Sequence, residues 1–596
     1  MKRITGILLS LIPLVLLAQP SGGPYGPLLQ NYEVPQDAHA VYYVAPDGNP
    51  ESSGKRLDTP TTIETAIAKV VTGDVIVLKG GVYRTGDLIL NQGITMQPYQ
   101  NEQPVLKGTW VADDWEALAN GLWRTKWERL FPSEAQDWWR RHREGKKTPP
   151  YKFNNDMVFI DGKFLQAKGW EGELDENSYT IDYKNGYVYI AADPTDKLVE
   201  ITAYNVGLLR TIADVHGKSN DHIGPVLKGI KLTQYAYRAI EIEGIEPEGP
   251  QEPGTFGRDV VGTTLEDVTI TFCSRVAGYF RGDNMVFRRC LISDTVTEGL
   301  YIIGSADVLL EKNIIARNNI EEITGYYPSA VKIFNQTHRV ICRDNLVVDQ
   351  PNSNGIWYDV GNVDGVFINN WIENCFDGFF FEISKGAVCA GNVFVNCDSG
   401  VRVLNSSNVH VYQNTLINSK ATFQRTPRSA ANDHFGWHPA TGPDVDERIG
   451  HIFTHNLMVA DADYNRPLLH VIQSPELCGL LTEPQLQELD YNVYARSTSD
   501  TDTPLILWSP VDSEECNGGL MNLAELIALN PAYEANGEDY GLYGGQVVQS
   551  ALLRNVQVLP DFPGNKPVDT LPKEIAELLN WDPSASFCKG AYPNGL

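Results

Sequence analysis

Hydrophobic and polar positions alternate in three short segments near the middle of the chain. These segments are Gly355–Val360, Gly378–Ile383 and Gly400–Asn405, and they start 23 and 22 residues apart. In each segment every second side chain is apolar, which predicts a β-strand with one buried face. A repeat of roughly 20 to 25 residues with one strand at a fixed phase is typical of a solenoid. The sequence therefore predicts a coil of stacked strands.

The same alternation continues upstream, in the segments 239–243, 277–281, 299–303 and 330–334. Their inward positions are nearly all aliphatic or Phe, as a packed coil requires. Sequence-equivalent strands of a solenoid lie parallel and in register, about 4.8 Å apart. The outward positions of the aligned strands are Glu241 and Glu243, Tyr279 and Arg281, Tyr301 and Ile303, Lys332 and Phe334, Trp357 and Asp359, Phe380 and Glu382, and Arg402 and Leu404.

Asparagines recur with the same period. Asn370, Asn392 and Asn414 are 22 residues apart, and so are Asn374, Asn396 and Asn418. Asparagine tolerates the left-handed backbone conformation and can hydrogen-bond to the equivalent turn above and below. We therefore interpret these residues as structural ladders at the turns of the coil rather than as catalytic groups.

Other segments cap and interrupt the repeat. Thr59–Lys69 has a threonine cap, an early glutamate and apolar spacing, which predict an amphipathic helix over the open end of the coil. The Asn185-Gly186 turn between alternating strands predicts a hairpin. The expected organisation begins with the first coils and the capping helix at 40–107, followed by an inserted small β-sandwich at 108–205. The main coils with a substrate groove follow at 206–495. Residues 496–596 are expected to form an irregular segment that packs on the coil and contains short helices at 522–529 and 573–579.

The first 18 residues are predicted to be a secretory signal peptide. Lys2 and Arg3 precede a short apolar run from Ile7 to Leu17, and a small residue follows it. This run is too short to span a membrane. No cysteine follows it, which excludes a lipid anchor at that site. We expect a secreted or periplasmic protein without a membrane span.

Charge and cysteine content narrow the function classes. The formal net charge is −27, which argues against a nucleic-acid partner. The nine cysteines cannot all pair, although Cys478 and Cys516 can do so, while Cys375 and Cys397 lie one repeat apart, like stacked interior residues. No cysteine or histidine cluster has zinc spacing. We expect no cofactor, and the sequence leaves the oligomeric state open.

Two acidic residues occupy equivalent outward positions on consecutive strands. The repeat places Asp359 directly beside Glu382. Carboxyl groups about 5 Å apart match the separation in a retaining glycosidase. Their mutual repulsion is expected to raise the pKa of one carboxyl, while the other stays ionised beside Lys332 or Arg402. Two alternatives stay open: a surface ion network with Lys332 and Arg402, or a calcium site, for which two acids supply few ligands.

The outward row also offers groups that suit sugars. Tyr301, Trp357 and Phe380 are predicted to be exposed aromatic platforms of a groove, with Lys332 and Arg402 binding hydroxyls or a carboxylate. A long insertion between 420 and 450 can add binding residues, because such loops often carry function. Its candidates are His434, Trp437 and His438. The alternative is that this insertion covers the rings as a satellite core.

At these residues the chain resembles a known group of enzymes. The chain resembles right-handed parallel β-helix glycoside hydrolases in its early strand–helix–strand segment, its interrupting sandwich and its Asp359/Glu382 pair. Among these enzymes it most resembles glycoside hydrolase family 120, the β-xylosidase family, and then family 141. The resemblance covers most of residues 40 to 470 and implies an all-β, right-handed parallel β-helix. It also implies Asp359 as the nucleophile and Glu382 as the acid/base.

The outward row of residues is compatible with three functions. The first is an exported retaining glycoside hydrolase, exo-acting and xylosidase-like, on oligosaccharides from plant or algal polysaccharide. The second is a polysaccharide lyase that acts on uronates, with Lys332 as base and Arg281 or Arg402 neutralising the carboxylate. The third is a non-catalytic carbohydrate-binding β-helix. The phased acid pair favours the hydrolase, because binding alone does not require it.

Overall fold

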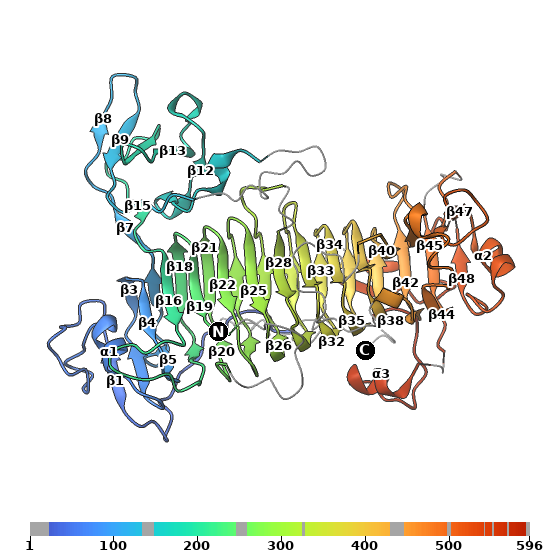
Figure 1. Cartoon of the computed structure of the whole chain (residues 1–596), viewed down its shortest axis with the longest axis horizontal. Helices are drawn as coiled ribbons and strands as arrows, with labels where there is room; N and C mark the ends of the chain where they lie inside the picture. Colours follow the sequence, from blue (N-terminus) through green and yellow to red (C-terminus); the bar gives the residue numbers. More distant parts are fainter. Residues whose placement is uncertain are drawn as a thin grey trace, which may run out of the picture.

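The structure is a computed structural model that describes residues 23–133, 148–245, 259–324, 328–428, 446–497, 502–541, 543–550, 554–568 and 571–591. Three long sheets of 13 strands each wind together into one elongated coil (Figure 1). Neighbouring strands within these sheets are parallel, apart from one antiparallel pair at the end of the third sheet. The predicted right-handed parallel β-helix is confirmed.

The first long sheet contains the opening strand of the coil. Its strands are β1 (Val41–Val44), β2 (Val75–Leu78), β5 (Thr95–Pro98), β17 (Val226–Lys228), β20 (Thr264–Glu266), β23 (Val286–Arg288), β26 (Ala306–Glu311), β29 (His338–Arg343), β32 (Val363–Ile368), β35 (Lys385–Ala390), β38 (Ser407–Tyr412), β41 (His451–Thr454) and β44 (Leu486–Asp490).

The second long sheet is built mostly from short strands. Its strands are β3 (Gly81–Arg84), β6 (Pro104–Lys107), β18 (Lys231–Tyr235), β21 (Thr269–Cys273), β24 (Leu291–Ser293), β27 (Ile314–Ala316), β30 (Leu346–Val348), β33 (Trp371–Glu373), β36 (Val393–Val395), β39 (Thr415–Ile417), β42 (Leu457–Ala460), β45 (Val493–Arg496) and β48 (Glu538–Tyr540).

The third long sheet carries the outward row on which the candidate site lies. Its strands are β4 (Leu88–Leu90), β16 (Val206–Arg210), β19 (Arg238–Ile242), β22 (Val276–Phe280), β25 (Glu298–Ile303), β28 (Ser329–Phe334), β31 (Asn354–Asp359), β34 (Asp377–Glu382), β37 (Ser399–Leu404), β40 (Lys420–Arg425), β43 (Leu469–Gln473), β46 (Ile506–Trp508) and β47 (Gly518–Leu520).

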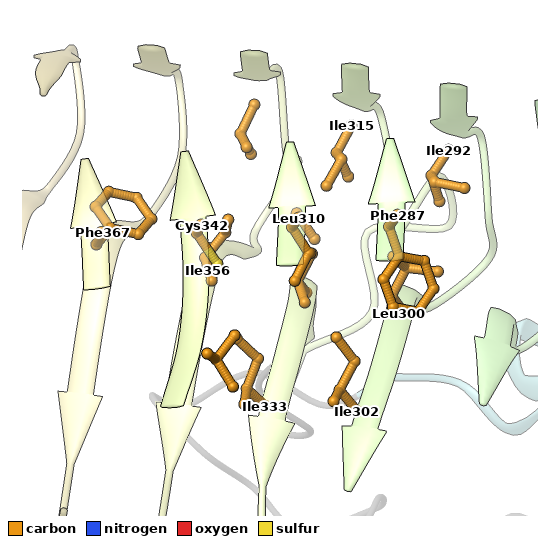
Figure 2. Close-up of a cluster of buried hydrophobic side chains, with 14 of the residues drawn as sticks. Phe287, Ile292, Leu300, Ile302, Leu310, Ile315, Ile333, Cys342, Ile356 and Phe367 are labelled. Carbon is orange, nitrogen blue, oxygen red and sulfur yellow. The ribbon is translucent and has the colours of Figure 1, made fainter. Parts of the chain in front are cut away.

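The inward side chains of the three sheets form one continuous core along the coil. Aliphatic and aromatic residues from successive turns stack on equivalent residues of the next turn, as Phe287, Leu310, Cys342 and Phe367 do (Figure 2). Burying such side chains stabilises each by about 1.5–3 kcal/mol relative to exposure. The alternation seen in the sequence is therefore the alternation between this core and the outer surface.

The asparagine ladder is confirmed and is longer than expected. The buried Asn370 side chain donates to Oδ1 of Asn392 at 3.0 Å, and Asn392 donates to Asn414 at 2.9 Å. The same contact continues through Asn345 on one side and Asn456 on the other. Each buried amide thus has its hydrogen bonds satisfied by the turns beside it.

A separate two-sheet insert interrupts the early coils. One sheet contains β7 (Thr109–Val111), β10 (Val158–Ile160), β11 (Lys163–Phe164) and β15 (Val199–Thr202), and the other contains β8 (Glu116–Ala117), β9 (Trp123–Lys126), β12 (Gln166–Ala167), β13 (Ser178–Asp182) and β14 (Tyr187–Ile190). It has its own buried cluster and projects from the coil near its amino-terminal end (Figure 1). The expected inserted sandwich is therefore present.

Helices lie outside the long sheets. Helix α1 (Ile63–Lys69) begins after the cap Thr62 and buries Ile63 and Ile67 against the first coils, as the sequence predicts. Two further helices in the described residues, α2 (Leu523–Leu529) and α3 (Lys573–Leu578), fall where the pattern places them. The remaining short elements are β49 (Val548–Ser550), β50 (Asn555–Val558) and the 3-10 helices Pro150–Phe153, Glu171–Glu173 and Pro475–Leu477.

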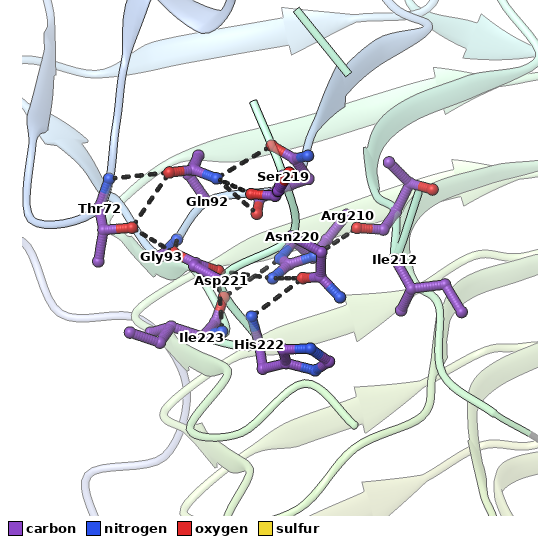
Figure 3. Close-up of polar contacts among 12 residues, drawn as sticks. Thr72, Gln92, Gly93, Arg210, Ile212, Ser219, Asn220, Asp221, His222 and Ile223 are labelled. Carbon is purple, nitrogen blue, oxygen red and sulfur yellow. Dashed lines mark hydrogen bonds and ion pairs between the residues drawn. The ribbon is translucent and has the colours of Figure 1, made fainter. Parts of the chain in front are cut away.

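A buried arginine fixes the connection between β16 and β17. Arg210 is fully buried and donates to Asn220 at 2.7 Å and to Asp221 at 2.8 Å (Figure 3). Asp221 also accepts from Gly93 at 2.6 Å, so the loop is tied to the preceding coil. This paired charge holds the segment that follows Arg210 in one conformation.

Cysteine pairing follows the sequence analysis. Cys478 and Cys516 form a disulfide, and both Cys375 and Cys397 are buried between the sheets. No helix in the described part of the chain is long and apolar enough to cross a membrane. The predicted signal peptide, residues 1–18, lies outside the described residues.

Candidate active site

The central register prediction is confirmed strand by strand. Asp359 on β31 is the Cα partner of Glu382 on β34. Neighbouring strands of a sheet lie about 4.8 Å apart, so the two carboxylates project side by side from consecutive turns. The preceding coil places Phe334 beside Asp359, and the following coil places Leu404 beside Glu382. An acid pair thus lies between two apolar neighbours.

Glu382 is enclosed and its charge is compensated. Its side chain is only 2% exposed; it accepts from Trp357 Nε1 at 3.1 Å and forms an ion pair with Arg428. Burial first, and the negative charge of Asp359 second, raise the pKa of Glu382 to about 7, although Arg428 opposes this shift. A carboxyl with such a pKa can hold a proton at neutral pH and later accept one.

Asp359 has a different environment. Its Oδ2 lies 3.1 Å from Nζ of Lys332, and its side chain is 15% exposed. Its Oδ1 is buried and has no hydrogen-bond partner among the residues that the structure describes. The two oxygens of Asp359 therefore differ, because only Oδ2 lies beside a cation.

Trp357 and Phe380 are not exposed platforms, so that expectation is wrong. They are only 6% and 5% exposed because their rings stack on each other with centroids 4.9 Å apart. Nζ of Lys332 lies 4.0 Å from the Trp357 ring, and the Arg402 guanidinium lies 4.8 Å from Phe380. Cations at both ends of the stack leave little of either ring face free.

Arg402 is held by an acid that the sequence analysis did not single out. Asp377, at the start of β34, is fully buried and accepts from Arg402 at 2.7 Å. Burial raises the pKa of Asp377, whereas Arg402 lowers it. The repeat could have pointed to Asp377, because it lies on the same strand as Glu382. Its partner in the strand register is Ser399 of the next turn.

Arg428 is the second residue that the site prediction missed. It belongs to the insertion after β40 and contacts Glu382 across 46 positions of sequence. No periodicity reports a contact made by a loop, so only its place in the insertion pointed to it. His434, Trp437 and His438, the predicted binding residues of that insertion, lie outside the described residues.

Tyr301 lies farther along the same row. It is half-buried, its ring packs edge-on against Phe334 at 5.2 Å, and its hydroxyl donates to Glu298 at 2.7 Å. Tyr301 and Lys332 are Cα partners, which joins this ring to the acid pair through one further strand. Within the described residues, no group of three or more His, Cys, Asp or Glu side chains is arranged to hold a metal ion.

Comparison with known proteins finds the same architecture elsewhere. A family model described as the right handed beta helix region matches residues 238–420. The solved structure of XylC in complex with xylose is 15% identical, with a TM-score of 0.54, over 79% of this chain and 88% of that chain. At this identity the similarity shows a shared fold. No curated protein matches the sequence.

Two more distant structures also align over most of their length. One is a glycoside hydrolase, 9% identical with a TM-score of 0.34 over 85% of this chain and 98% of that one. The other is the pectate lyase Pel9A, 11% identical with a TM-score of 0.35 over 94% and 97%. The family model and the XylC structure confirm, for the fold, the resemblance to right-handed β-helix enzymes drawn from the sequence.

Proposed function

We propose that the protein is a retaining glycoside hydrolase that removes a terminal sugar from an oligosaccharide. The observation that carries this proposal is the pairing of Asp359 with Glu382 on adjacent outward positions. Strand spacing brings the two carboxyl groups to about the 5 Å separation that a double-displacement mechanism uses. The contrast between their environments supports two distinct roles.

Glu382 acts first as the general acid. Its pKa of about 7 keeps it largely protonated in slightly acidic solution, so it can give its proton to the glycosidic oxygen as the bond to the leaving group breaks. As that bond breaks, a carboxylate oxygen of Asp359 forms a covalent bond to the anomeric carbon. Loss of the leaving group carries away the Glu382 proton, and Glu382 becomes a base.

The second step releases the sugar. Ionised Glu382 takes a proton from water, and the resulting oxygen nucleophile attacks the anomeric carbon on the face opposite Asp359. The bond to Asp359 breaks, which regenerates the carboxylate beside Lys332. Two inversions leave the anomeric configuration unchanged, and Glu382 holds its proton again.

The surrounding charges favour this reaction over elimination from a uronate. A lyase would need Lys332 as a free base, but Lys332 is paired with Asp359 and stacked on Trp357. Arg402, one of the two arginines proposed to neutralise a substrate carboxylate, already binds Asp377. Each of the three cations, Lys332, Arg402 and Arg428, already has an acidic side chain of the protein beside it, which suits a neutral sugar.

A panel of aryl glycosides tests the proposal, with β-xyloside first because the structure of XylC with xylose shares this fold. Asp359→Asn and Glu382→Gln should each lower kcat by orders of magnitude while the folded state persists. NMR of the first product should show the same anomer as the substrate. An inverted product, or full activity in either variant, would remove the proposed roles. An absorbance rise on oligogalacturonates would instead indicate a lyase.

A further inference from the structure

A large polar cavity lies on the same face as the acid pair, several turns nearer the amino-terminal end of the coil. Its volume is about 660 Å³, within the usual range for ligand sites. Strands β19, β22 and β25 form its floor. The residues that define it for the argument below are Arg238, Glu241, Tyr279, Arg281, Glu298 and Tyr301.

The cavity and the candidate active site lie on one row of outward positions. The outward row runs from Glu241 to Tyr279, Tyr301, Lys332 and Trp357, with each residue the Cα partner of the next. Strand spacing puts Tyr301 about 10 Å and Glu241 about 19 Å from Trp357 along the coil. One strand spacing is close to the length of one sugar unit, so the cavity faces units two to four positions from the cleaved sugar.

Aromatic rings line the path between the two regions. Tyr279 packs against Tyr301 at 6.1 Å, and Tyr301 packs against Phe334 at 5.2 Å. Phe334 in turn is the Cα partner of Asp359. Aromatic side chains present apolar surface to the C–H faces of sugar rings. A glycan that follows the row therefore meets a ring at several successive steps.

The polar groups of the cavity are fixed before any ligand binds. Glu298 is 2% exposed and accepts from the Tyr301 hydroxyl. Glu243 accepts from the hydroxyl of Thr211 at 2.6 Å and from the backbone of Ile212 at 3.2 Å, in the segment that buried Arg210 anchors (Figure 3). Groups held in this way lose little freedom on binding, which favours affinity.

The inserted sandwich contributes to this arrangement. Arg275, at the cavity wall, donates to Asn155 of the insert at 3.0 Å. Its guanidinium also contacts Ser133. The insert is therefore attached to the coil beside the cavity, where it can set the width of the groove.

The charges of the cavity are balanced. Three guanidinium groups, of Arg238, Arg275 and Arg281, face three carboxyl groups, of Glu241, Glu243 and Glu298. Arg238 lies 3.3 Å from Glu241. A polyanionic glycan would meet three acids here, whereas a neutral sugar can donate hydroxyls to the carboxylates and accept from the arginines.

We propose that this cavity is a distal binding subsite for a neutral oligosaccharide whose terminal sugar lies between Asp359 and Glu382. The inference rests on the proposed hydrolase function. The glycan runs from the acid pair along β28 and β25 toward β19, so substrates that reach the cavity are processed more efficiently than short ones. The protein is then an exo-acting enzyme for oligosaccharides rather than for disaccharides alone.

The test compares substrate lengths. Values of kcat/KM are measured for xylobiose through xylohexaose, with the cello-oligosaccharide series in parallel, in wild type, Tyr279→Ala and Tyr99→Ala. Tyr99 is half-buried on a turn after β5, away from the row, and serves as the matched control. In wild type kcat/KM should rise until the chain reaches the cavity. Tyr279→Ala should lower the hexamer-to-dimer ratio by about tenfold, the worth of one ring contact, and Tyr99→Ala should leave it as in wild type.

Calorimetry separates this inference from the hydrolase proposal. Xylohexaose and cellohexaose are titrated into Glu382→Gln with and without Tyr279→Ala. Hexamer binding that weakens with Tyr279→Ala supports the subsite even where wild type hydrolyses neither series, and in that case the hydrolase proposal fails alone. The subsite is overturned if neither hexamer binds, if Tyr279→Ala leaves both binding and the length ratio unchanged, or if oligogalacturonates bind more tightly than neutral hexamers.

Discussion

Val360 and Ile383 pack against each other directly behind the two carboxylates, and both adopt the left-handed backbone conformation, with φ of 44° and 41°. They immediately follow Asp359 and Glu382. No other β-branched residue in the described part of the chain has a positive φ. The equivalent residues of the flanking coils are Asn335 and Asn405, which tolerate this conformation.

This exchange of asparagine for β-branched residues is confined to the two turns that carry the acid pair. A left-handed conformation costs roughly 1–3 kcal/mol for such residues, and strain of this kind tends to gather at functional sites. Val360 and Ile383 place buried apolar side chains where the flanking turns have the amides of Asn335 and Asn405. Burial is the main cause of the raised pKa of Glu382, and we expect this apolar pair to contribute to it.

Ile383→Asn should shift the pH dependence of activity to lower pH. An amide behind Glu382 reduces its desolvation, so its pKa falls from about 7 toward its usual value. The general acid then loses its proton earlier, and the basic limb of kcat/KM against pH moves down by about half a unit or more. Asn405→Ile in the next turn is the matched control. An unmoved basic limb in a folded Ile383→Asn variant would contradict this account.

Trp357→Phe should shift the same limb in the opposite direction. The indole Nε1 donates to Oε2 of Glu382 at 3.1 Å, a contact that stabilises the ionised form. Phenylalanine keeps a ring against Phe380 but cannot donate, so the pKa of Glu382 rises. The basic limb of kcat/KM should move to higher pH, while Phe380→Tyr should leave it in place. A downward shift in Trp357→Phe would show that this hydrogen bond does not act on the charged carboxyl.

The outward row shows how much of the site a repeat can predict. The pairing of Asp359 with Glu382, and of Lys332 with Trp357, follows from the period alone because parallel strands of a coil stack equivalent residues. The same reasoning located the asparagine ladder and the core. Register, however, says which residues are neighbours and not how far their side chains are covered.

Burial and loop contacts could not be predicted in this way. Trp357 and Phe380 occupy outward positions, yet each covers the other and a cation covers each end of the stack. Arg428 reaches Glu382 from an insertion that has no repeat to align. Long side chains and loops are free to fold over an outer face, and the alternation of a strand carries no record of that.

Lys332→Met should lower activity more than the loss of a positive charge elsewhere on the surface would. Lys332 lies 3.1 Å from Oδ2 of Asp359, which then remains largely buried without its cation. Methionine preserves the aliphatic contact with Trp357, so packing is kept while the charge is lost. We expect kcat/KM on an aryl glycoside to fall by about 100-fold, because the nucleophile loses the cation that positions its Oδ2. Lys312→Met, on a turn after β26, is the control and should retain activity. Equal activity in both variants would show that Asp359 does not depend on Lys332.

Glu382→Gln should make the protein more stable at high pH although it removes the proposed acid. In the folded protein the pKa of Glu382 is about 7, above the ordinary value of 4.5, so the folded state binds the proton more tightly than the unfolded chain. Stability from this group is complete below pH 4.5 and is lost as pH rises through about 7. Glutamine cannot ionise and escapes this loss, which amounts to roughly 1–3 kcal/mol. Thermal unfolding should therefore show a higher Tm for Glu382→Gln than for wild type well above pH 7, and no such gain below pH 4.5.

Glu176→Gln, at an exposed position of the insert, should follow wild type at every pH. A Glu382→Gln variant that gains no stability above pH 7 would mean that burial does not raise the pKa of Glu382. The role of general acid assigned to Glu382 would then lose its physical basis.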